Sequence, residues 1–374
     1  MPWRSVTLMS QRIEFIMLNE NKEINFTDLC RRFNISRKTG YKWLQRYRND
    51  GVQGLNNRSR CPRRIVRRIK PSVEEAIVSL RFKHPTWGAR KIRKCLQVTC
   101  TDSLPVCSTI TSVFHRHNLT NPDKPHGRRD WQRFEHPAPN SLWQMDFKGA
   151  VKTLSGDCHP LTVLDDHSRF NLCLAAKPNQ RTETVFAALT DTFRFSGLPD
   201  IILVDNGSPW GSDAGHPYTP LGLWIMRLGI RVAHSRPYHP QTLGKADRFH
   251  RTLKYDLLNL RQWQDIHQLQ RAFDAWRQEY NFDRPHDSLD LNVPASRYKP
   301  SLRSFPEKLP PLEYPSEAFV RKVQQGGIFS FKGRHFKISK CFGGYPIGIM
   351  PTVTDGIFDV LFCNHRVLKI DIKT

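Results

Sequence analysis

Proline-rich breaks divide this chain of 374 residues, and they constrain its architecture more than any other feature. Prolines cluster within residues 121–140 and 300–316, and glycines and prolines punctuate residues 51–71. Because both residue types interrupt helices and strands, we expect linkers in these stretches. A chain of this length is also too long for one ordinary core. The sequence therefore predicts several domains joined by linkers.

The character of the segments between these breaks indicates a different fold class for each. Helical patterns dominate the N-terminal third, strands followed by helix–strand alternation occupy the middle, and short strands between glycine turns end the chain. The expected fold is thus all-α, then α/β, then a small all-β barrel. We expect a helix-turn-helix domain at 1–56, a basic linker at 57–71, a second helical domain at 72–120, a linker at 121–139, an α/β core at 140–299, a proline-rich linker at 300–316 and the β-barrel at 317–374.

Positive charge is concentrated in the N-terminal part of the chain. The protein has 58 Lys and Arg against 34 Asp and Glu, a formal net charge of +24. Fourteen of these basic residues, and only one acid, lie between Arg31 and Lys70. Such an excess favours a polyanionic partner, since each neutralised phosphate releases counterions. The clustering favours nucleic acid as that partner over the alternative of a basic protein that is merely soluble.

An anionic membrane surface would also attract this stretch. However, the sequence contains no apolar run of about 18 residues, and no signal peptide opens it. We therefore expect no membrane partner and a cytoplasmic, nucleoid-associated location.

The nine cysteines include no CxxC pair. Cys95, Cys100 and Cys107 lie near His115 and His117, but their spacing fits no zinc pattern. We expect ordinary reduced thiols.

Residues 25–48 have the order of a helix-turn-helix. Asn25 or Thr27 can cap a short helix that ends near Asn34, and Ser36 can cap a basic helix over residues 37–48. In DNA-binding proteins the second of two such helices enters the major groove. A plain helical hairpin is the alternative, but the local charge favours DNA binding. We expect DNA contacts from this helix and the following linker, at Arg37, Lys38, Lys42, Arg46, Arg58, Arg60, Arg63, Arg64, Arg67 and Arg68.

Residues 72–119 also have helical patterns. A second helix-turn-helix and a pure packing domain both remain open for this segment.

Two strand-like apolar runs in the middle of the chain each carry a carboxylate. Asp146 interrupts the run at 142–149, and Asp205 follows the run that begins at Ile201. A single Asp at a strand end is usually a turn or cap residue. Two in adjacent buried strands, however, need partners or a metal ion, and carboxylate oxygens suit Mg²⁺ or Mn²⁺.

A third carboxylate lies on a basic helix that follows the turn at 235–240. Asp247, His250, Arg251 and Lys254 recur at helical spacing on one face. A carboxylate beside cations suits a site that holds a metal ion and a phosphate together, although a solvated face is the alternative. We expect DNA contacts near this carboxylate from Lys245, Arg248, Arg251 and Lys254.

Other polar residues in this region are expected to have supporting roles. His239 and His250 are interpreted as orienting or packing residues rather than metal ligands. Asp165 and Asp166 are interpreted as hairpin residues, although Asp166 could flank the site.

Three motifs, in order, resemble the integrase core of bacterial insertion-sequence transposases. They are WQMDF at 143–147, DNGSP at 205–209 and the segment from HPQT to FHRTLK at 239–254. The resemblance covers about residues 140–300, and three motifs at compatible spacing are more specific than any one of them. It implies an RNase H-like fold of the retroviral-integrase superfamily, of the DDE type.

The resemblance implies that Asp146, Asp205 and Asp247 are the catalytic, metal-binding acids. The family has Glu at the third position, so Asp247 is a departure that shortens the side chain by one methylene, about 1.5 Å of reach. A helix shift, a bridging water, and reduced or lost activity all remain open.

The activity that the resemblance implies is two-metal phosphoryl transfer with two Mg²⁺ or Mn²⁺ ions. The implied partners are double-stranded DNA, both terminal inverted repeats and target, and further copies of the chain in at least a dimer. A catalytically impaired or domesticated DNA-binding protein is the alternative function, and a plain nuclease is a third.

Overall fold

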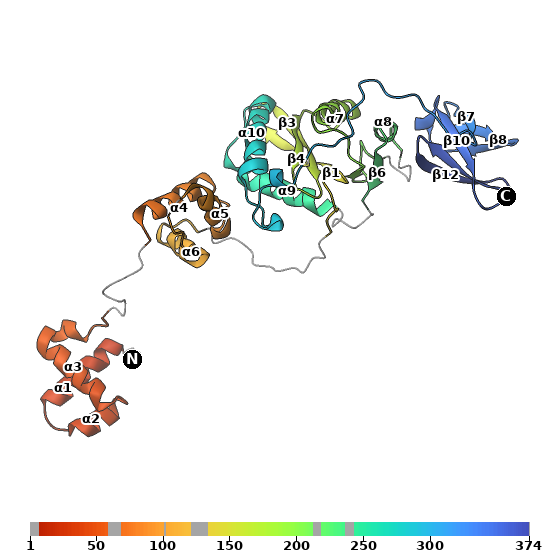
Figure 1. Cartoon of the computed structure of the whole chain (residues 1–374). Coiled ribbons are helices and arrows are strands. Elements are labelled where there is room, and N and C mark those ends of the chain that lie inside the picture. Colours follow the sequence, from red (N-terminus) through yellow and green to blue (C-terminus); the bar gives the residue numbers. More distant parts are fainter. Residues whose placement is uncertain are drawn as a thin grey trace. The chain divides into compact units, whose positions relative to one another are not determined.

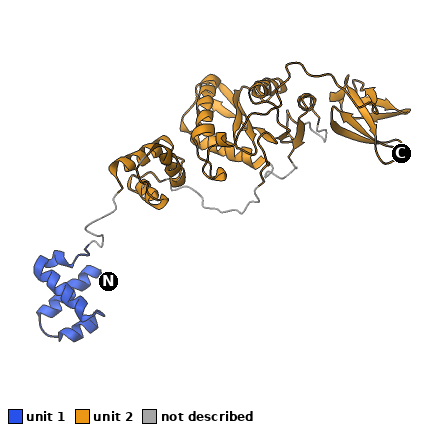
Figure 2. Cartoon of the chain, viewed as in Figure 1, with its two compact units in different colours: residues 1–68 blue, residues 69–374 orange. Residues whose placement is uncertain are grey.

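The computed structural model describes residues 7–58, 69–100, 102–120, 134–211, 218–235 and 243–373. The chain divides into two compact units, Met1–Arg68 and Ile69–Thr374 (Figure 2). Their boundary falls within the linker expected at 57–71. No helix within the described ranges is long and apolar enough to cross a membrane.

The first unit contains the predicted helix-turn-helix. Helices α1 (Leu8–Glu20), α2 (Phe26–Arg32) and α3 (Arg37–Asp50) are followed by a 3₁₀ turn at Gly51–Leu55 (Figure 1). The side chain of Asn25 caps α2 by accepting from the amide of Thr27, and Ser36 caps α3 by accepting from the amide of Thr39. Both caps confirm the expected helix starts.

Close packing of α3 explains a glycine inside that helix. A Cβ on Gly40 would lie 2.8 Å from the Sγ of Cys30 and 2.9 Å from the ring of Phe26. Gly40 therefore lets α3 approach α2 closely, even though glycine weakens a helix interior.

Three further helices, α4 (Pro71–Lys83), α5 (Ala89–Thr99) and α6 (Cys107–Arg116), open the second unit. They share one apolar core. Arg81 is buried there, and its guanidinium donates to the carbonyl oxygens of Trp87 and Leu119. These hydrogen bonds tie the α4–α5 connection and the C-terminal end of the domain to α4, and they satisfy a buried charge.

The middle of the chain is a six-stranded mixed sheet with helices on both faces. The central order is β2-β3-β1-β5-β6, and β4 pairs with β3. Strand β1 is antiparallel to β3 and parallel to β5. This confirms the predicted α/β core. Its elements are β1 (Trp143–Phe147), β2 (Val151–Thr153), β3 (Gly156–Asp165), β4 (Asn171–Lys177), α7 (Thr182–Ser196), β5 (Ile201–Val204), α8 (Pro220–Arg227), β6 (Arg231–His234), α9 (Gly244–Asp256) and α10 (Ile266–Gln278).

Each face of this sheet has its own apolar core. Trp143 and Met145 of β1 pack with α7 and α8, whereas Leu174 of β4 packs with α9 and α10. Because side chains alternate along a strand, the residues between Trp143 and Met145 must face α9. A π-helix at Glu279–Asp283 and 3₁₀ turns at Leu258–Leu260, Asp287–Leu289 and Pro294–Ser296 complete this part of the chain.

The C-terminal part is all-β, as predicted. A four-stranded antiparallel sheet in the order β12-β11-β10-β7 lies beside a hairpin of β8 and β9. Leu223 and Met226 of α8 enter the core of these sheets. Helix α8 is thus shared between the α/β core and the β domain. The strands are β7 (Phe319–Lys322), β8 (Ile328–Phe331), β9 (Arg334–Lys337), β10 (Pro346–Pro351), β11 (Ile357–Phe362) and β12 (His365–Asp371), with a 3₁₀ turn at Lys340–Phe342.

This shared helix leads to a prediction for stability. Leu223 is 2% exposed, so Leu223→Ala leaves a cavity where α8 meets the β domain. The variant should unfold with a free energy lower by about 2–5 kcal/mol in chemical denaturation. Leu302 is fully exposed, and the matched variant Leu302→Ala should stay within about 0.5 kcal/mol of the parent protein. Equal effects of the two changes would contradict this packing.

Candidate active site

Strand β1 presents two polar side chains toward α9. Trp143 and Met145 point into the core on the other face, so Gln144 and Asp146 alternate with them toward the helix. Gln144 is 3% exposed, and its Oε1 accepts from the backbone amide of Ala246 at 3.1 Å. This hydrogen bond joins β1 directly to the first turn of α9.

A buried ion pair anchors the same turn. The Nζ of Lys245 lies 2.5 Å from Oδ2 of Asp166, whose side chain is completely buried. Oδ1 of Asp166 accepts from Nε2 of Gln144 at 2.9 Å, and its Oδ2 also accepts from the amide of His136 at 2.8 Å. Asp166 thus connects β1, the hairpin and α9. Lys245, which the sequence predicts to contact DNA, forms this ion pair in the structure.

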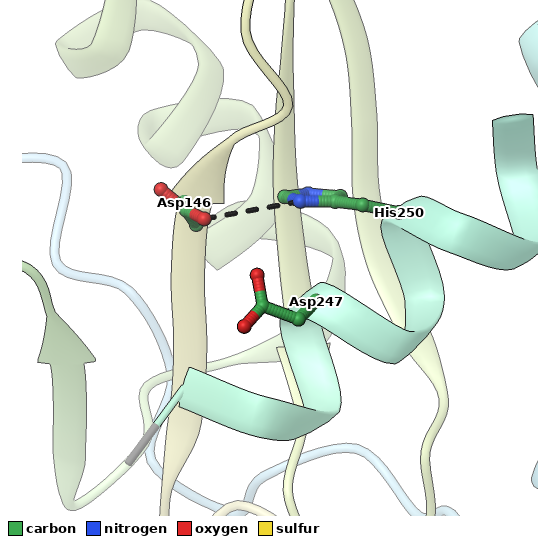
Figure 3. A group of neighbouring side chains, drawn as sticks. All are labelled: Asp146, Asp247 and His250. Carbon is green, nitrogen blue, oxygen red and sulfur yellow. Dashed lines mark ion pairs between the residues drawn. The ribbon is translucent and has the colours of Figure 1, made fainter. Parts of the chain in front are cut away.

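Helix α9 brings Asp247 and His250 to Asp146 (Figure 3). One potential ligand atom from each of the three lies within 4.8 Å of the others. Asp146 and His250 are largely buried and Asp247 is exposed, so the group opens to solvent on the Asp247 side. Two of the three predicted acids therefore lie together, and a histidine lies with them.

Asp205 approaches this group from the neighbouring strand. Strand β5 pairs with β1 in parallel, so Asp205 directly after β5 lies at the same end of the sheet as Asp146. Its Oδ1 accepts from the amide of Gly207 at 3.1 Å. Burial raises the pKa of Asp205, and the hydrogen bond from Gly207 opposes that rise.

The charges of Asp205 and Asp247 act on Asp146. Burial, then the negative charge of Asp205 and that of Asp247, raise the pKa of Asp146 to about 7. Burial also raises the pKa of Asp247, against the nearby positive charge of Arg251. Like charges held this close favour a proton or a cation between them. Perturbed carboxylates of this kind indicate a functional site.

His250 occupies the inner side of this group. Its Nε2 lies 2.8 Å from the hydroxyl of Thr162, and its Nδ1 lies 3.8 Å from Oδ2 of Asp146. Burial and the positive charge of Lys148 lower the pKa of His250 to about 4, so the ring is neutral near pH 7. The sequence placed His250 on the correct helical face, but neither Thr162 nor Gln144 was identified as part of the site. Only the strand alternation around Asp146 could have pointed to Gln144.

The other residues predicted to bind DNA fall into three groups. On α9, Arg248, Arg251 and Lys254 are exposed, and on α3 the same is true of Arg37, Lys38 and Lys42. Some of the predicted residues also contact the protein itself: Lys42 and Arg46 both lie over the ring of Trp43, and Arg58 pairs with Asp50. Outside the described residues lie Arg60, Arg63, Arg64, Arg67, Arg68 and also His239.

Asp165 has a structural role, as expected for a hairpin residue. It is fully buried and accepts from the amide of Asn140 and from the amide and hydroxyl of Ser168. In the described part of the chain the cysteines are free, and none joins a group that could hold a metal ion.

Comparisons with known families match almost every part of the chain. Two models of the integrase core domain match residues 136–240 and 228–294. The C-terminal domain of IS481 family transposases matches residues 318–374. A helix-turn-helix domain matches residues 11–64, and a homeodomain-like domain matches residues 39–113. The chain carries an integrase core domain of the kind found in insertion-sequence transposases. Its helix-turn-helix region and transposase-type C-terminal domain flank that core.

Two curated relatives come from insertion elements. A protein of element IS407 from Burkholderia multivorans is 25% identical over 42% of this chain, and one of IS476 from Xanthomonas euvesicatoria is 27% identical over 42%. These matches span 55% and 44% of the two relatives, so the chain spans about half the length of these proteins.

Solved structures of viral integrases are more distant. A simian T-cell lymphotropic virus intasome chain is 17% identical, with a TM-score of 0.37, over 78% of this chain and 99% of that one. The HTLV-2 integrase core in complex with magnesium is 15% identical, with a TM-score of 0.32, over 43% of this chain and 97% of that one.

The raised pKa of Asp146 predicts how pH affects the metal-free protein. The native state holds this proton more tightly than the unfolded chain, so the Asp146 contribution to the free energy of unfolding falls as pH rises from about 4 to 7. Asp146→Asn should therefore stabilise the metal-free protein more at pH 8 than at pH 4, by chemical denaturation. The difference between variant and parent is the relevant quantity, because the lowered pKa of His250 acts in the opposite direction over this range. A gain independent of pH would contradict the prediction.

Replacing each of two lysines of α9 by methionine should have very different effects on protein stability. Lys245→Met removes the partner of the buried Asp166 carboxylate and should lower the free energy of unfolding by about 3 kcal/mol. Lys254 is exposed, so Lys254→Met should change stability by less than about 0.5 kcal/mol. Lys254→Met should instead reduce the slope of log DNA affinity against log salt by about 1. Denaturation and salt-dependent DNA titration measure the two effects, and a stable Lys245→Met would refute the anchoring role.

Proposed function

We propose that this protein is a transposase that binds the terminal inverted repeats of an insertion sequence and catalyses metal-dependent DNA cleavage and strand transfer. The observation that carries the proposal is the grouping of Asp146, Asp205 and Asp247, where burial, together with the charges of Asp205 and Asp247, raises the pKa of Asp146 to about 7. Three such carboxylates within an integrase core suit phosphoryl transfer better than they suit a structural role.

The residues present fit a divalent cation. Carboxylate oxygens are the donors that Mg²⁺ and Mn²⁺ prefer, and a cation would relieve the repulsion that Asp205 and Asp247 exert on Asp146. Asp146, Asp205 and Asp247 would hold the metal, in our proposal two ions. When bound, such ions activate the attacking oxygen and stabilise the leaving oxygen of a phosphoryl transfer.

The protein's own side chains would position the DNA around this site. Arg248, Arg251 and Lys254 are exposed on α9 beside Asp247, where they could neutralise phosphates flanking the scissile bond. We propose no nucleophilic Ser or Tyr, because direct phosphoryl transfer requires no covalent enzyme intermediate.

DNA recognition would belong to the helix-turn-helix region. The exposed Arg37, Lys38 and Lys42 lie in the N-terminal half of α3, the part of a recognition helix that reaches base edges. Together with Arg46, the linker arginines Arg58, Arg60, Arg63, Arg64, Arg67 and Arg68 would add phosphate contacts. Joining two element ends to one target requires two copies of the site, so we propose at least a homodimer on DNA.

The test is strand transfer by the purified full-length protein. With Mg²⁺ or Mn²⁺ and DNA carrying the terminal repeats of its own element, the protein should nick the repeat ends and join them to a second DNA. Asp205→Asn should reduce both products below detection, because it removes one of the charged ligands. Nicking without joining would favour a plain nuclease, and the absence of both products would refute the transposase.

A second candidate function is a DNA-binding protein with impaired catalysis. The observation that favours it is Asp247, which stands where the resemblance to insertion-sequence transposases implies Glu and whose side chain is about 1.5 Å shorter than that of Glu. Asp247→Glu separates the two functions. Strand transfer that changes little supports a competent enzyme, whereas a gain of tenfold or more would identify this copy as impaired.

A further inference from the structure

The histidine in the carboxylate group has two ring nitrogens in different environments. His250 is 7% exposed, and its Nε2 lies 2.8 Å from the hydroxyl oxygen of Thr162. Its Nδ1 faces Oδ2 of Asp146 at 3.8 Å (Figure 3). The ring therefore has one nitrogen bound to the sheet and the other directed to the acids.

Hydrogen bonding to Thr162 determines which nitrogen carries the proton. The hydroxyl of Thr162 donates to the backbone carbonyl oxygen of Asp146 at 2.9 Å, and that carbonyl can only accept. The single hydroxyl proton is thereby used, so the oxygen of Thr162 must accept from Nε2–H of His250. In a neutral ring this leaves Nδ1 unprotonated, with its lone pair toward Asp146.

The distance from Nδ1 to Asp146 fits a shared cation better than a hydrogen bond. A separation of 3.8 Å exceeds the range of N–H···O hydrogen bonds, which ends near about 3.2 Å. Two ligands at about 2.1 Å from one ion can lie up to about 4.2 Å apart. One ring nitrogen of His250 and one oxygen each from Asp146 and Asp247 lie within 4.8 Å of one another. With Nδ1 as the free nitrogen, these atoms form a mixed nitrogen and oxygen donor set.

The other ring nitrogen of His250 also has a hydrogen-bond partner in the protein. A metal-binding histidine usually fixes its ring by donating the other N–H to an oxygen of the protein. Thr162 provides that oxygen from β3, the strand that pairs with β1, and Asp146 and Thr162 are directly opposite in the register. The orientation of the ring is thus fixed by the same strand pair that carries the first acid.

We propose that His250 is a metal ligand through Nδ1, together with Asp146 and Asp247. The proposal rests on the metal site of the proposed function and extends it to a nitrogen donor. Imidazole binds transition-metal ions better than it binds Mg²⁺. The site should therefore select ions such as Mn²⁺ or Co²⁺ over Mg²⁺ more strongly than three carboxylates alone would.

The decisive measurement is pulsed electron paramagnetic resonance on the full-length protein with Mn²⁺ and no DNA. A directly bound histidine should give ¹⁴N modulation of the Mn²⁺ signal, and protein labelled with ¹⁵N-histidine should show ¹⁵N coupling in its place. This comparison needs no mutation, so no folding defect can affect it. Bound Mn²⁺ without nitrogen coupling would overturn the proposal and leave the proposed function intact. No Mn²⁺ binding at all would overturn both.

A pair of histidine variants tests affinity separately. His250→Gln should lower Mn²⁺ affinity on the order of tenfold, with a smaller loss for Mg²⁺, and should remove the nitrogen coupling. His267 is exposed on α10 of the same domain, and His267→Gln should change none of these properties. Circular dichroism should show that both variants are folded. Equal losses for Mn²⁺ and Mg²⁺, or nitrogen coupling that persists in folded His250→Gln, would overturn the proposal.

Discussion

The buried ion pair between Lys245 and Asp166 sets the relation between the two elements that carry the acids. Lys245 precedes Asp247 on α9, and Gln144, which binds the same Asp166 carboxylate, precedes Asp146 on β1. The Asp166 carboxylate therefore fixes the position of β1 relative to α9, immediately beside Asp146 and Asp247. Asp166 is costly to bury, and its pairing with Lys245, Gln144 and the His136 amide offsets that cost. A rigid anchor of this kind suits a site whose ligands must keep their positions.

The acids themselves oppose folding of the metal-free chain. Burial, together with the negative charges of Asp205 and Asp247, raises the pKa of Asp146, and the stability of this region comes from the apolar residues around the acids. Phe249 and Leu253 of α9, each at most 2% exposed, pack against the face of the sheet that Asp146 shares. Helix α9 is thus held by one apolar stripe while its other side presents Asp247, Arg251 and Lys254. Unfavourable placement of like charges, tolerated because the surrounding core is stable, is typical of functional sites.

Periodicity and capping chemistry were sufficient to predict the helices around Asn25 and Ser36 and the strand around Asp146, because those patterns are local. Partners far apart in the sequence were not predictable. Lys245 resembles the other cations of its helix, and its role depends on Asp166, 79 positions away, which the hairpin brings beside it. Helix α8 was missed for a related reason: it is apolar on both sides because it serves two cores, so it has no polar face to reveal a helical period.

The consequence of having Asp at position 247 depends on all the proposed metal ligands, and not on this side chain alone. A comparison of residue types at position 247 shows only that the side chain is one methylene shorter. The helical spacing of three residues also places His250 on the same face, and β3 holds its ring with Nδ1 toward Asp146. If His250 binds the ion as proposed, the ion would no longer depend on the reach of Asp247 alone, and that carboxylate would bind from the solvent side. The substitution of Asp for Glu would then alter which metal the site prefers, rather than whether it binds one.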